Sequence, residues 1–232
     1  MGVRWWFSDR HGGLGSAPYD TLNVALHVGD DPAVVLQNRR LLAAQLGQPG
    51  PALVFMDQVH GDRVAVVDAI SDAPLATDAM VTRTVGLGLA VMVADCVPVL
   101  MADAEAGVVA AVHAGRPGLR SQVVLRALEA MARLGGSRSS TVAWLGPSVC
   151  AGCYEVPADM RADVASVVPA AWSTSRSGTP ALDLRAGLCA ELVSAGVTAT
   201  CVGPCTAESA DHFSYRRDHV TGRCVGVVWL EP

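Results

Sequence analysis

Three short apolar runs that follow one another in the middle of the chain restrict its fold more than any other feature. The runs are Leu87–Val93, Val97–Met101 and Val108–Val112, and Asp, Pro and Gly separate them. Continuous apolar runs of this length are typical of strands that are buried on both faces. The pattern therefore predicts a central sheet whose two faces are both covered.

The flanking segments supply elements that can cover such a sheet. Apolar residues at helical spacing, ended by Gly or Pro, predict helices over 32–46, 119–134, 158–168 and 184–195. Further short apolar runs predict strands over 3–7, 53–55, 64–67, 141–145 and 225–230. No internal repeat or low-complexity linker interrupts the order. We expect one domain over residues 1–232, of the α/β (α+β) class, with mixed β-sheets covered by helices.

Composition and charge exclude several classes of protein. Hydrophobic residues make up 51% of the chain and charged residues 17%, which a disordered chain would not show. A net charge of −5 with 17 Lys and Arg argues against a nucleic-acid partner. The longest apolar stretch contains Asp95 and Pro98, so it predicts two strands and no membrane span. The start lacks the apolar core of an export signal and the seven cysteines are odd in number, so we expect free thiols and a cytoplasmic protein.

Three polar residues at the ends of predicted strands are candidates for a metal site. They are His60 in Gln-Val-His-Gly, Cys96 in Asp-Cys-Val-Pro, and His113 in Val-His-Ala-Gly. Two imidazoles and one thiolate suit Zn²⁺ and leave a fourth tetrahedral position for water or substrate. Asp95 is placed to act as an acceptor behind the ligands or as an acid/base group. The alternative is that the histidines are structural and Cys96 is a small buried residue.

Two further patterns have weaker implications. Arg216, Arg217 and Arg223 lie in a loop rich in Ser and Thr, where guanidinium groups could bind an anion; the alternative is a solvated loop with surface ion pairs. Cys150 and Cys153 form a Cys-x-x-Cys pair without a second pair nearby, so a redox or zinc role has little support. The other cysteines are expected to be packing residues.

Eleven segments taken together resemble one family, the YfiH-type proteins. Its members carry the labels polyphenol oxidase laccase domain, purine nucleoside phosphorylase and peptidoglycan editing factor. The match runs in order over nearly the whole chain. The segments are Leu22–Asp31, Asn38–Arg39, Gln58–Gly61, Thr77–Thr82, Ala94–Pro98, Val112–Gly115, Gly146–Pro147, Tyr154–Val156, Cys205–Thr206, Phe213–Asp218 and Thr221–Arg223.

The resemblance implies a fold similar to the cytotoxic necrotizing factor-like cysteine hydrolases and a zinc ion on His60, Cys96 and His113. It implies phosphorolysis of adenosine, inosine, guanosine and 5′-methylthioadenosine, and possible deamination of adenosine. Nucleoside and phosphate would then be the partners, with Arg39 a further candidate for the anion. The chain departs from the family at Arg116-Pro117, where the family usually has Trp and a basic residue.

Other functions stay open from the sequence. In a Cys–His amide hydrolase, Cys96 would be the nucleophile and His113 its base, acting on a substrate such as a peptidoglycan precursor. A non-catalytic zinc domain is a further alternative. A copper polyphenol oxidase is disfavoured, because several coppers need many imidazoles and this chain has six histidines and no His-x-His pair. The sequence does not indicate an oligomeric state.

Overall fold

Two large β-sheets form the centre of the molecule. The computed structural model of the chain describes residues 2–47, 50–70 and 75–231. Among these residues a five-stranded sheet has the order β1-β13-β6-β2-β4, a six-stranded sheet has the order β12-β9-β7-β8-β5-β3, and β10 pairs with β11. The strands are β1 (Gly2–Phe7), β2 (Ala52–Asp57), β3 (Val64–Val66), β4 (Leu75–Ala76), β5 (Ala79–Thr82), β6 (Leu87–Val93), β7 (Val97–Asp103), β8 (Val108–Ala114), β9 (Thr141–Leu145), β10 (Trp172–Thr174), β11 (Pro180–Leu182), β12 (Thr198–Cys201) and β13 (Cys224–Glu231).

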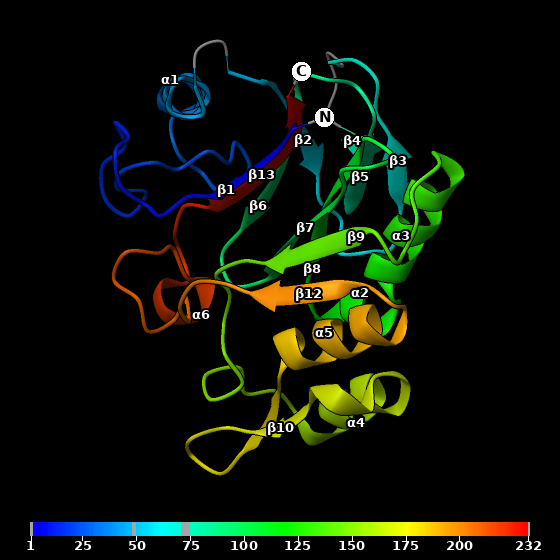
Figure 1. Cartoon of the computed structure of the whole chain (residues 1–232). Helices are drawn as coiled ribbons and strands as arrows, with labels where there is room; N and C mark the ends of the chain where they lie inside the picture. The colour runs from blue at the N-terminus through cyan, green and yellow to red at the C-terminus, as the bar shows by residue number, and fades with distance from the viewer. Residues whose placement is uncertain (1, 48–49, 71–74, 232) are drawn as a thin grey trace.

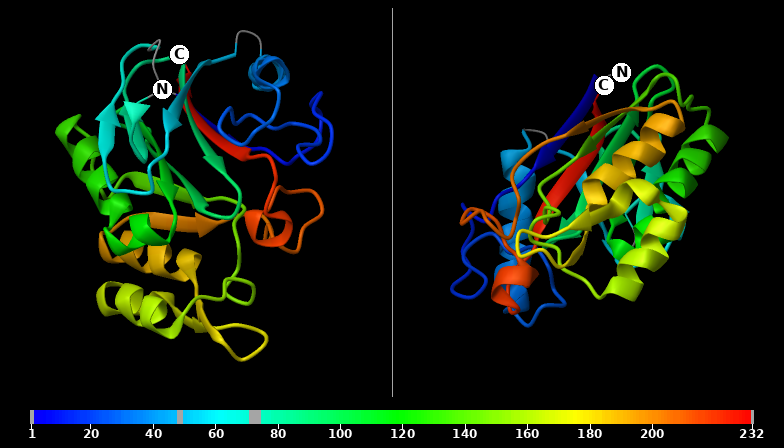
Figure 2. Two further views of the ribbon diagram at one scale, coloured as in Figure 1. Left: turned by 180° about the vertical axis from the view of Figure 1, so that it is seen from behind. Right: turned by 90° about the horizontal axis from the view of Figure 1, so that it is seen from below.

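Helices lie on both outer sides of the paired sheets (Figures 1 and 2). Helix α1 covers the five-stranded sheet, whereas α2, α3 and α5 pack on the six-stranded sheet and α4 packs beside α2. The two ends of the chain are neighbours because β1 pairs with β13. The helices are α1 (Pro32–Gln45), α2 (Arg116–Arg120), α3 (Val123–Arg133), α4 (Ala158–Val167), α5 (Leu184–Ser194) and α6 (Tyr215–Asp218), with a 3₁₀ turn at Pro169–Ala171.

Strand β7 shows why the central runs are apolar throughout. Val97, Val99 and Met101 pack against the helices on one face of the six-stranded sheet. Leu100 and Ala102 alternate with them and pack against the five-stranded sheet on the other face. Because successive side chains of a strand point to opposite faces, a strand between two layers must be apolar at every position.

The expected fold class is confirmed, and the predicted central strands coincide with β6, β7 and β8 to within two residues. The predicted single helix over 119–134 is wrong. The N–H groups of Ser121 and Gln122 bond back to Pro117 and Leu119 and close α2, and Gln122 takes a left-handed conformation with φ of 60°. A left-handed residue breaks the helical hydrogen-bond ladder, so α3 begins anew at Val123.

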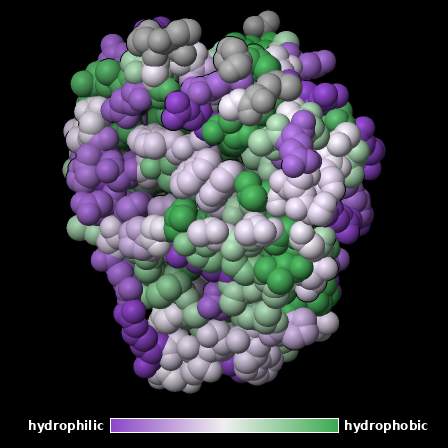
Figure 3. All heavy atoms as spheres, in the orientation of Figure 1, coloured by the Kyte–Doolittle hydropathy of each residue, from purple (hydrophilic) through white to green (hydrophobic). Residues whose placement is uncertain are grey.

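The surface is mixed in character. Hydrophilic and hydrophobic residues are interspersed over the face seen in Figure 3. Within the described ranges, the structure contains no helix whose length and apolar character would allow it to cross a bilayer.

Candidate active site

The fold brings together the three residues that the sequence suggested as metal ligands. His113 is buried near the end of β8, Cys96 is half-buried in the turn between β6 and β7, and His60 is exposed in the loop after β2. One nitrogen or sulfur atom of each lies within 4.8 Å of the others. The two imidazole rings meet edge to face, with centroids 4.7 Å apart. The turn containing Cys96 passes from one sheet to the other, so the cluster sits where the ends of both sheets meet.

A buried carboxylate, Asp78, orients both histidines. Its Oδ1 accepts hydrogen bonds from His113 Nδ1 at 2.8 Å and from the backbone N–H of His60 at 2.9 Å. Its Oδ2 accepts from the N–H of Gly61 at 2.6 Å. Burial raises the pKa of Asp78, but the hydrogen bonds from His113 and Gly61 outweigh it and lower the pKa. Such a carboxylate behind a metal-binding imidazole fixes the ring and its free nitrogen.

Asp78 was not among the residues suggested as functional from the sequence. It stands between two short strands without any local pattern that marks it. The only sequence signal was its place in Thr77–Thr82, one of the segments that resemble the YfiH-type family.

Gly115 makes room for the cluster. A Cβ atom at this position would lie 2.8 Å from Cys96 Sγ and 3.3 Å from His60 Cδ2. Both distances are shorter than ordinary contacts, so any larger residue would displace a ligand. The Val-His-Ala-Gly sequence therefore supplies one ligand and the space for two others.

The neighbouring groups set the ionisation of Cys96 and His113. Burial alone would raise the pKa of Cys96, but the charge and hydrogen bond of His113, aided by His60, lower it to about 6. Burial alone would lower the pKa of His113, but Cys96 and Asp78 raise it to about 9. At neutral pH the pair is a thiolate beside an imidazolium, and the thiolate is the form that binds metals or acts as a nucleophile.

Asp95, expected as a proton shuttle or acceptor, has both carboxylate oxygens occupied. Its Oδ1 accepts from Thr206 Oγ1 at 2.6 Å and from Ser214 Oγ at 2.7 Å, and its Oδ2 accepts from the N–H of Arg216 at 2.6 Å. Asp95 has a positive φ of 122°. These contacts attach the turn that carries Cys96 to the loop before α6 and to the first turn of α6.

The cluster opens into a pocket of about 320 Å³. This volume is at the lower end of the range for small-molecule sites. Arg216 and Arg223, two of the predicted anion-binding residues, line it together with aromatic and apolar side chains. The lining residues are His27, Gln58, His60, Met92, Val93, Ala94, Asp95, Cys96, His113, Tyr154, Tyr215, Arg216 and Arg223.

Arg39 and Arg217, which were also expected to bind the substrate, are not among the residues that line the pocket. Arg39 donates to the carbonyl of Val24 at 2.8 Å, and its guanidinium stacks 3.8 Å from the ring centre of Phe55. Arg217 forms an ion pair with Asp218 at 2.7 Å. It also donates to the carbonyls of Thr206, Ser209 and His212. The three nitrogens of the Arg217 guanidinium all bind within the protein, whereas Arg39 uses Nε on Val24 and one terminal nitrogen on Met92 Sδ.

Several lining residues were not suggested from the sequence, and His27, Tyr154 and Tyr215 are among them. Partial burial and the nearby charge of Arg223 lower the pKa of His27, which favours the neutral imidazole. Tyr154 and Tyr215 add aromatic rings to the pocket, and the guanidinium of Arg216 lies 5.1 Å from the ring centre of Tyr154. The segments containing His27 and the tyrosines matched the family pattern, but spacing gave no reason to place them together.

The fold and the site define an α+β protein with a His–Cys–His cluster at the base of a small pocket. A family model described as "Multi-copper polyphenol oxidoreductase laccase" matches residues 4–231. The chain therefore belongs to this family, and the resemblance to YfiH-type proteins is confirmed. The crystal structure of Bacillus licheniformis YfiH has a TM-score of 0.89 and 29% identity, covering 99% of this chain and 93% of that one.

Relatives with high identity carry a more specific name. A Streptomyces coelicolor protein named purine nucleoside phosphorylase SCO2081 is 54% identical, over 99% of this chain and 96% of its own length. A Mycobacterium tuberculosis protein named purine nucleoside phosphorylase Rv2149c is 51% identical, over 99% of this chain and 92% of its own length.

Proposed function

We propose that this chain is a zinc-dependent purine nucleoside phosphorylase. The observation that carries the proposal is that one pocket combines the His–Cys–His cluster with two arginines and two tyrosines. The names of the relatives support the same reaction class. Zinc and the choice of nucleoside are parts of this proposal.

The three residues of the cluster fit a catalytic zinc site. They offer two nitrogens and one sulfur, which is a ligand set that Zn²⁺ uses in enzymes, and the pocket leaves the fourth direction open. Asp78 fixes the ring of His113 so that its other nitrogen faces Cys96. When bound there, zinc would supply Lewis acidity toward a group of the substrate.

Arg216 and Arg223 are the proposed phosphate ligands. Arg216 uses one N–H group on the carbonyl of Glu155 at 3.1 Å. Arg223 uses one nitrogen on the carbonyls of Thr221 and Gly222. Since a guanidinium has five N–H donors, both arginines keep donors for phosphate oxygens.

The other walls of the pocket suit a purine nucleoside. Tyr154 and Tyr215 offer aromatic faces, while Met92 and Val93 offer apolar contacts. A purine ring can stack on such side chains, and His27 can donate or accept a hydrogen bond at the ribose or the base. Gln58 binds the N–H and the carbonyl of Met92 through its amide and keeps one N–H donor.

The reaction requires the pocket to hold the two reactants in line. An oxygen of hydrogen phosphate forms a bond to C1′ of the ribose as the bond from C1′ to the purine nitrogen breaks. The purine leaves with the electron pair and takes up the proton that the phosphate brought. The positive charge of Arg216 and Arg223 would concentrate the dianion and hold it for attack.

Product analysis by chromatography tests the proposal. Purified protein is incubated with adenosine, with and without phosphate, and the control is the Cys96→Ser variant. The proposal predicts adenine and ribose 1-phosphate only when phosphate is present. Inosine in both tubes would instead indicate deamination, and unchanged adenosine would contradict both nucleoside activities.

A second candidate function is a Cys–His hydrolase that acts on an amide. The observation that favours it is the thiolate–imidazolium pair of Cys96 and His113, with Asp78 behind the histidine. This arrangement resembles a nucleophile, its base and an orienting carboxylate. Amide hydrolysis that persists in chelator and stops after alkylation by iodoacetamide would support it. Phosphorolysis that is lost in chelator would contradict it.

A further inference from the structure

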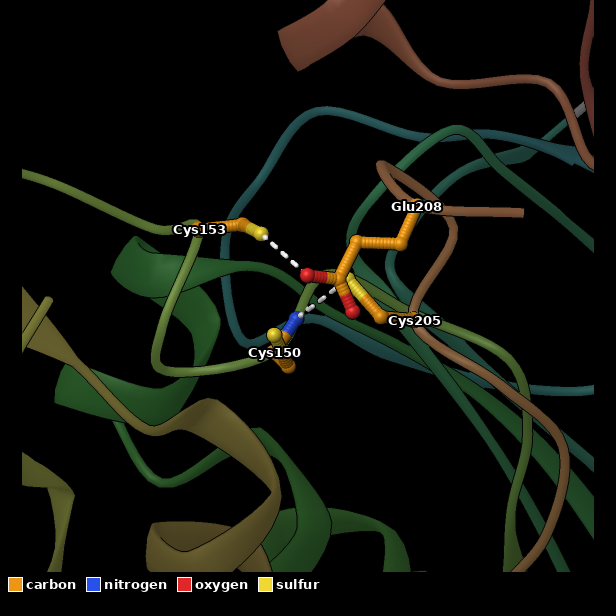
Figure 4. A group of neighbouring side chains, drawn as sticks. All are labelled: Cys150, Cys153, Cys205 and Glu208. Carbon is orange, nitrogen blue, oxygen red and sulfur yellow. Dashed lines mark hydrogen bonds between the residues drawn. The ribbon is translucent and has the colours of Figure 1, made fainter. Parts of the chain in front are cut away.

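A second group of potential metal ligands lies outside the pocket lining. Cys150, Cys153, Cys205 and Glu208 each offer one ligand atom, and these atoms all lie within 4.8 Å of one another. Figure 4 shows the four side chains converging from two loops. The first loop follows β9 and contains the Cys-x-x-Cys pair, and the second precedes α6. We refer to these four residues as the thiol cluster.

The local backbone shapes the thiol cluster and directs one N–H group at a sulfur. The N–H groups of Cys153 and Tyr154 both donate to the carbonyl of Cys150 at 3.0 Å, which forms the turn that brings Cys153 back toward Cys150. The N–H of Cys150 donates to Cys205 Sγ at 3.2 Å. Cys153 Sγ donates to a carboxylate oxygen of Glu208 at 3.4 Å. A backbone N–H pointing at a sulfur stabilises the thiolate form.

We propose that the thiol cluster is a structural metal site that takes Zn²⁺. Three thiolates and one carboxylate complete a tetrahedral set made only of protein ligands, which is typical of closed, structural zinc sites. Thiolates also select Zn²⁺ over the hard cations that prefer oxygen. The weak expectation for the Cys-x-x-Cys pair changes because Cys205, 55 residues further along, supplies a third sulfur.

The position of the thiol cluster indicates what the metal would do. Ser148 and Cys205 form a β-bridge between the two loops. Thr206, beside Cys205, donates to Asp95 in the turn that carries Cys96, and Tyr154, beside Cys153, lines the pocket. A zinc ion joining the loops would therefore stabilise one wall of the pocket without contacting the substrate.

An ion pair of Glu208 competes with metal binding by the same side chain. Arg176 forms an ion pair with the same oxygen of Glu208 that accepts from Cys153. A carboxylate has a second oxygen, so Glu208 can bind a metal through one and Arg176 through the other. This arrangement also lowers the net negative charge of a site with three thiolates.

Metal counting in a Cys96→Ser background tests the thiol cluster independently of the proposed active site. The variant is loaded with Zn²⁺, loosely bound metal is removed by dialysis, and zinc is measured by mass spectrometry. We expect one zinc per chain in the Cys96→Ser variant. Each of the two double variants, Cys96→Ser/Cys153→Ser and Cys96→Ser/Cys205→Ala, should lose this zinc. The matched control, Cys96→Ser/Cys201→Ser, removes an exposed cysteine outside both clusters and should keep the zinc.

A second measurement covers the case in which the double variants fail to fold. Co²⁺ replaces Zn²⁺ in the Cys96→Ser protein, and we expect the sulfur-to-cobalt absorption of several thiolates with the intensity of a tetrahedral site. Cys96→Ser protein without zinc and without this absorption would overturn the proposal. Two thiols missing from a titration of the fresh protein would also overturn it, because they would indicate a disulfide in place of a metal.

Discussion

The molecule contains two clusters of potential metal ligands, and Cys96 in one and Cys153 in the other have pKa values that shift in opposite directions. Cys96 has two histidines as neighbours, and His113 lowers the pKa of Cys96 to about 6 in spite of burial. Burial together with Cys150 and Cys205 raises the pKa of Cys153 to about 12. The difference shows that the partners of a thiol, more than its depth in the protein, decide whether it is a thiolate in the absence of metal.

The clusters also differ in whether a substrate could reach a metal bound there. The His–Cys–His cluster forms part of a pocket and offers three ligand atoms, so a metal held there would keep a position for substrate. The thiol cluster offers four ligand atoms and lies outside the pocket lining. We therefore assign chemistry to the first and stabilisation to the second, and four predictions test this assignment.

The largest effect on catalysis is expected when one cysteine of each cluster, Cys96 or Cys153, is replaced in turn. Cys96→Ser removes a zinc ligand that faces the pocket, so kcat/KM for phosphorolysis should fall by about 10²-fold or more. Cys153→Ser leaves the pocket ligands in place and should lower Tm more than kcat/KM. Initial rates and thermal melting of both variants check this. An equal loss of kcat/KM in the two variants would contradict the division of roles.

Asp78→Asn is expected to have the next largest effect. The amide keeps one acceptor oxygen and no charge, so it cannot accept both from His60 and His113, which share Oδ1, and from Gly61, which uses Oδ2. Zinc affinity at the His–Cys–His cluster should fall by about 10- to 100-fold, as is typical of carboxylates behind metal ligands. Chelator competition measures the affinity. Activity of the variant should recover in excess zinc, whereas a residue that acts directly on substrate would show no recovery.

The arginines of the pocket should affect phosphate more than nucleoside. Arg223→Ala removes donors for the dianion, so KM for phosphate should rise by about tenfold, with a smaller change in KM for adenosine. The control is Arg4→Ala, which removes an arginine from an exposed ion pair with Glu231. Steady-state kinetics with each substrate varied in turn separate the two constants. A selective rise for adenosine would place phosphate elsewhere.

The smallest predicted effect concerns alkylation of the metal-free protein by iodoacetamide. Because the pKa of Cys96 is about 6, the rate at which iodoacetamide alkylates Cys96 should be nearly constant above about pH 7. The rate should fall as the pH drops through 6, because the thiolate is then protonated. Cys153, with a pKa of about 12, should stay unmodified over the same range. Peptide mass spectrometry resolves the two cysteines. A rate for Cys96 that keeps rising with pH through 8 would mean that its pKa is not lowered.

Patterns along the chain predicted the strands and helices of each layer better than they predicted the contacts between residues far apart in the sequence. The central strands were predictable because a strand between two layers is apolar at every position, as in β7. The three potential ligands His60, Cys96 and His113 were visible because each is a polar residue with metal-binding chemistry next to an apolar run that predicts a strand. Gln122 was not recognised as the break between α2 and α3, since no Gly or Pro marks its left-handed conformation in the sequence.

The remaining site residues depend on distances that only the fold sets. Asp78 supports His113 from 35 residues away, and Cys205 joins Cys150 from 55 residues away. The arginines that looked alike in the sequence separate into Arg223, which lines the pocket, and Arg39 and Arg217, which bind the backbone. No spacing rule distinguishes a guanidinium that supports the chain from one that meets a ligand.

The most direct test of the central claim is a zinc titration of catalysis in the Cys153→Ser variant, in which the thiol cluster is disabled. The variant is stripped with chelator, and the phosphate-dependent release of adenine from adenosine is measured as zinc is restored. We predict no activity without zinc and a linear rise that ends at one zinc per chain. Full activity in the stripped protein would contradict the assignment of catalysis to a metal on His60, Cys96 and His113.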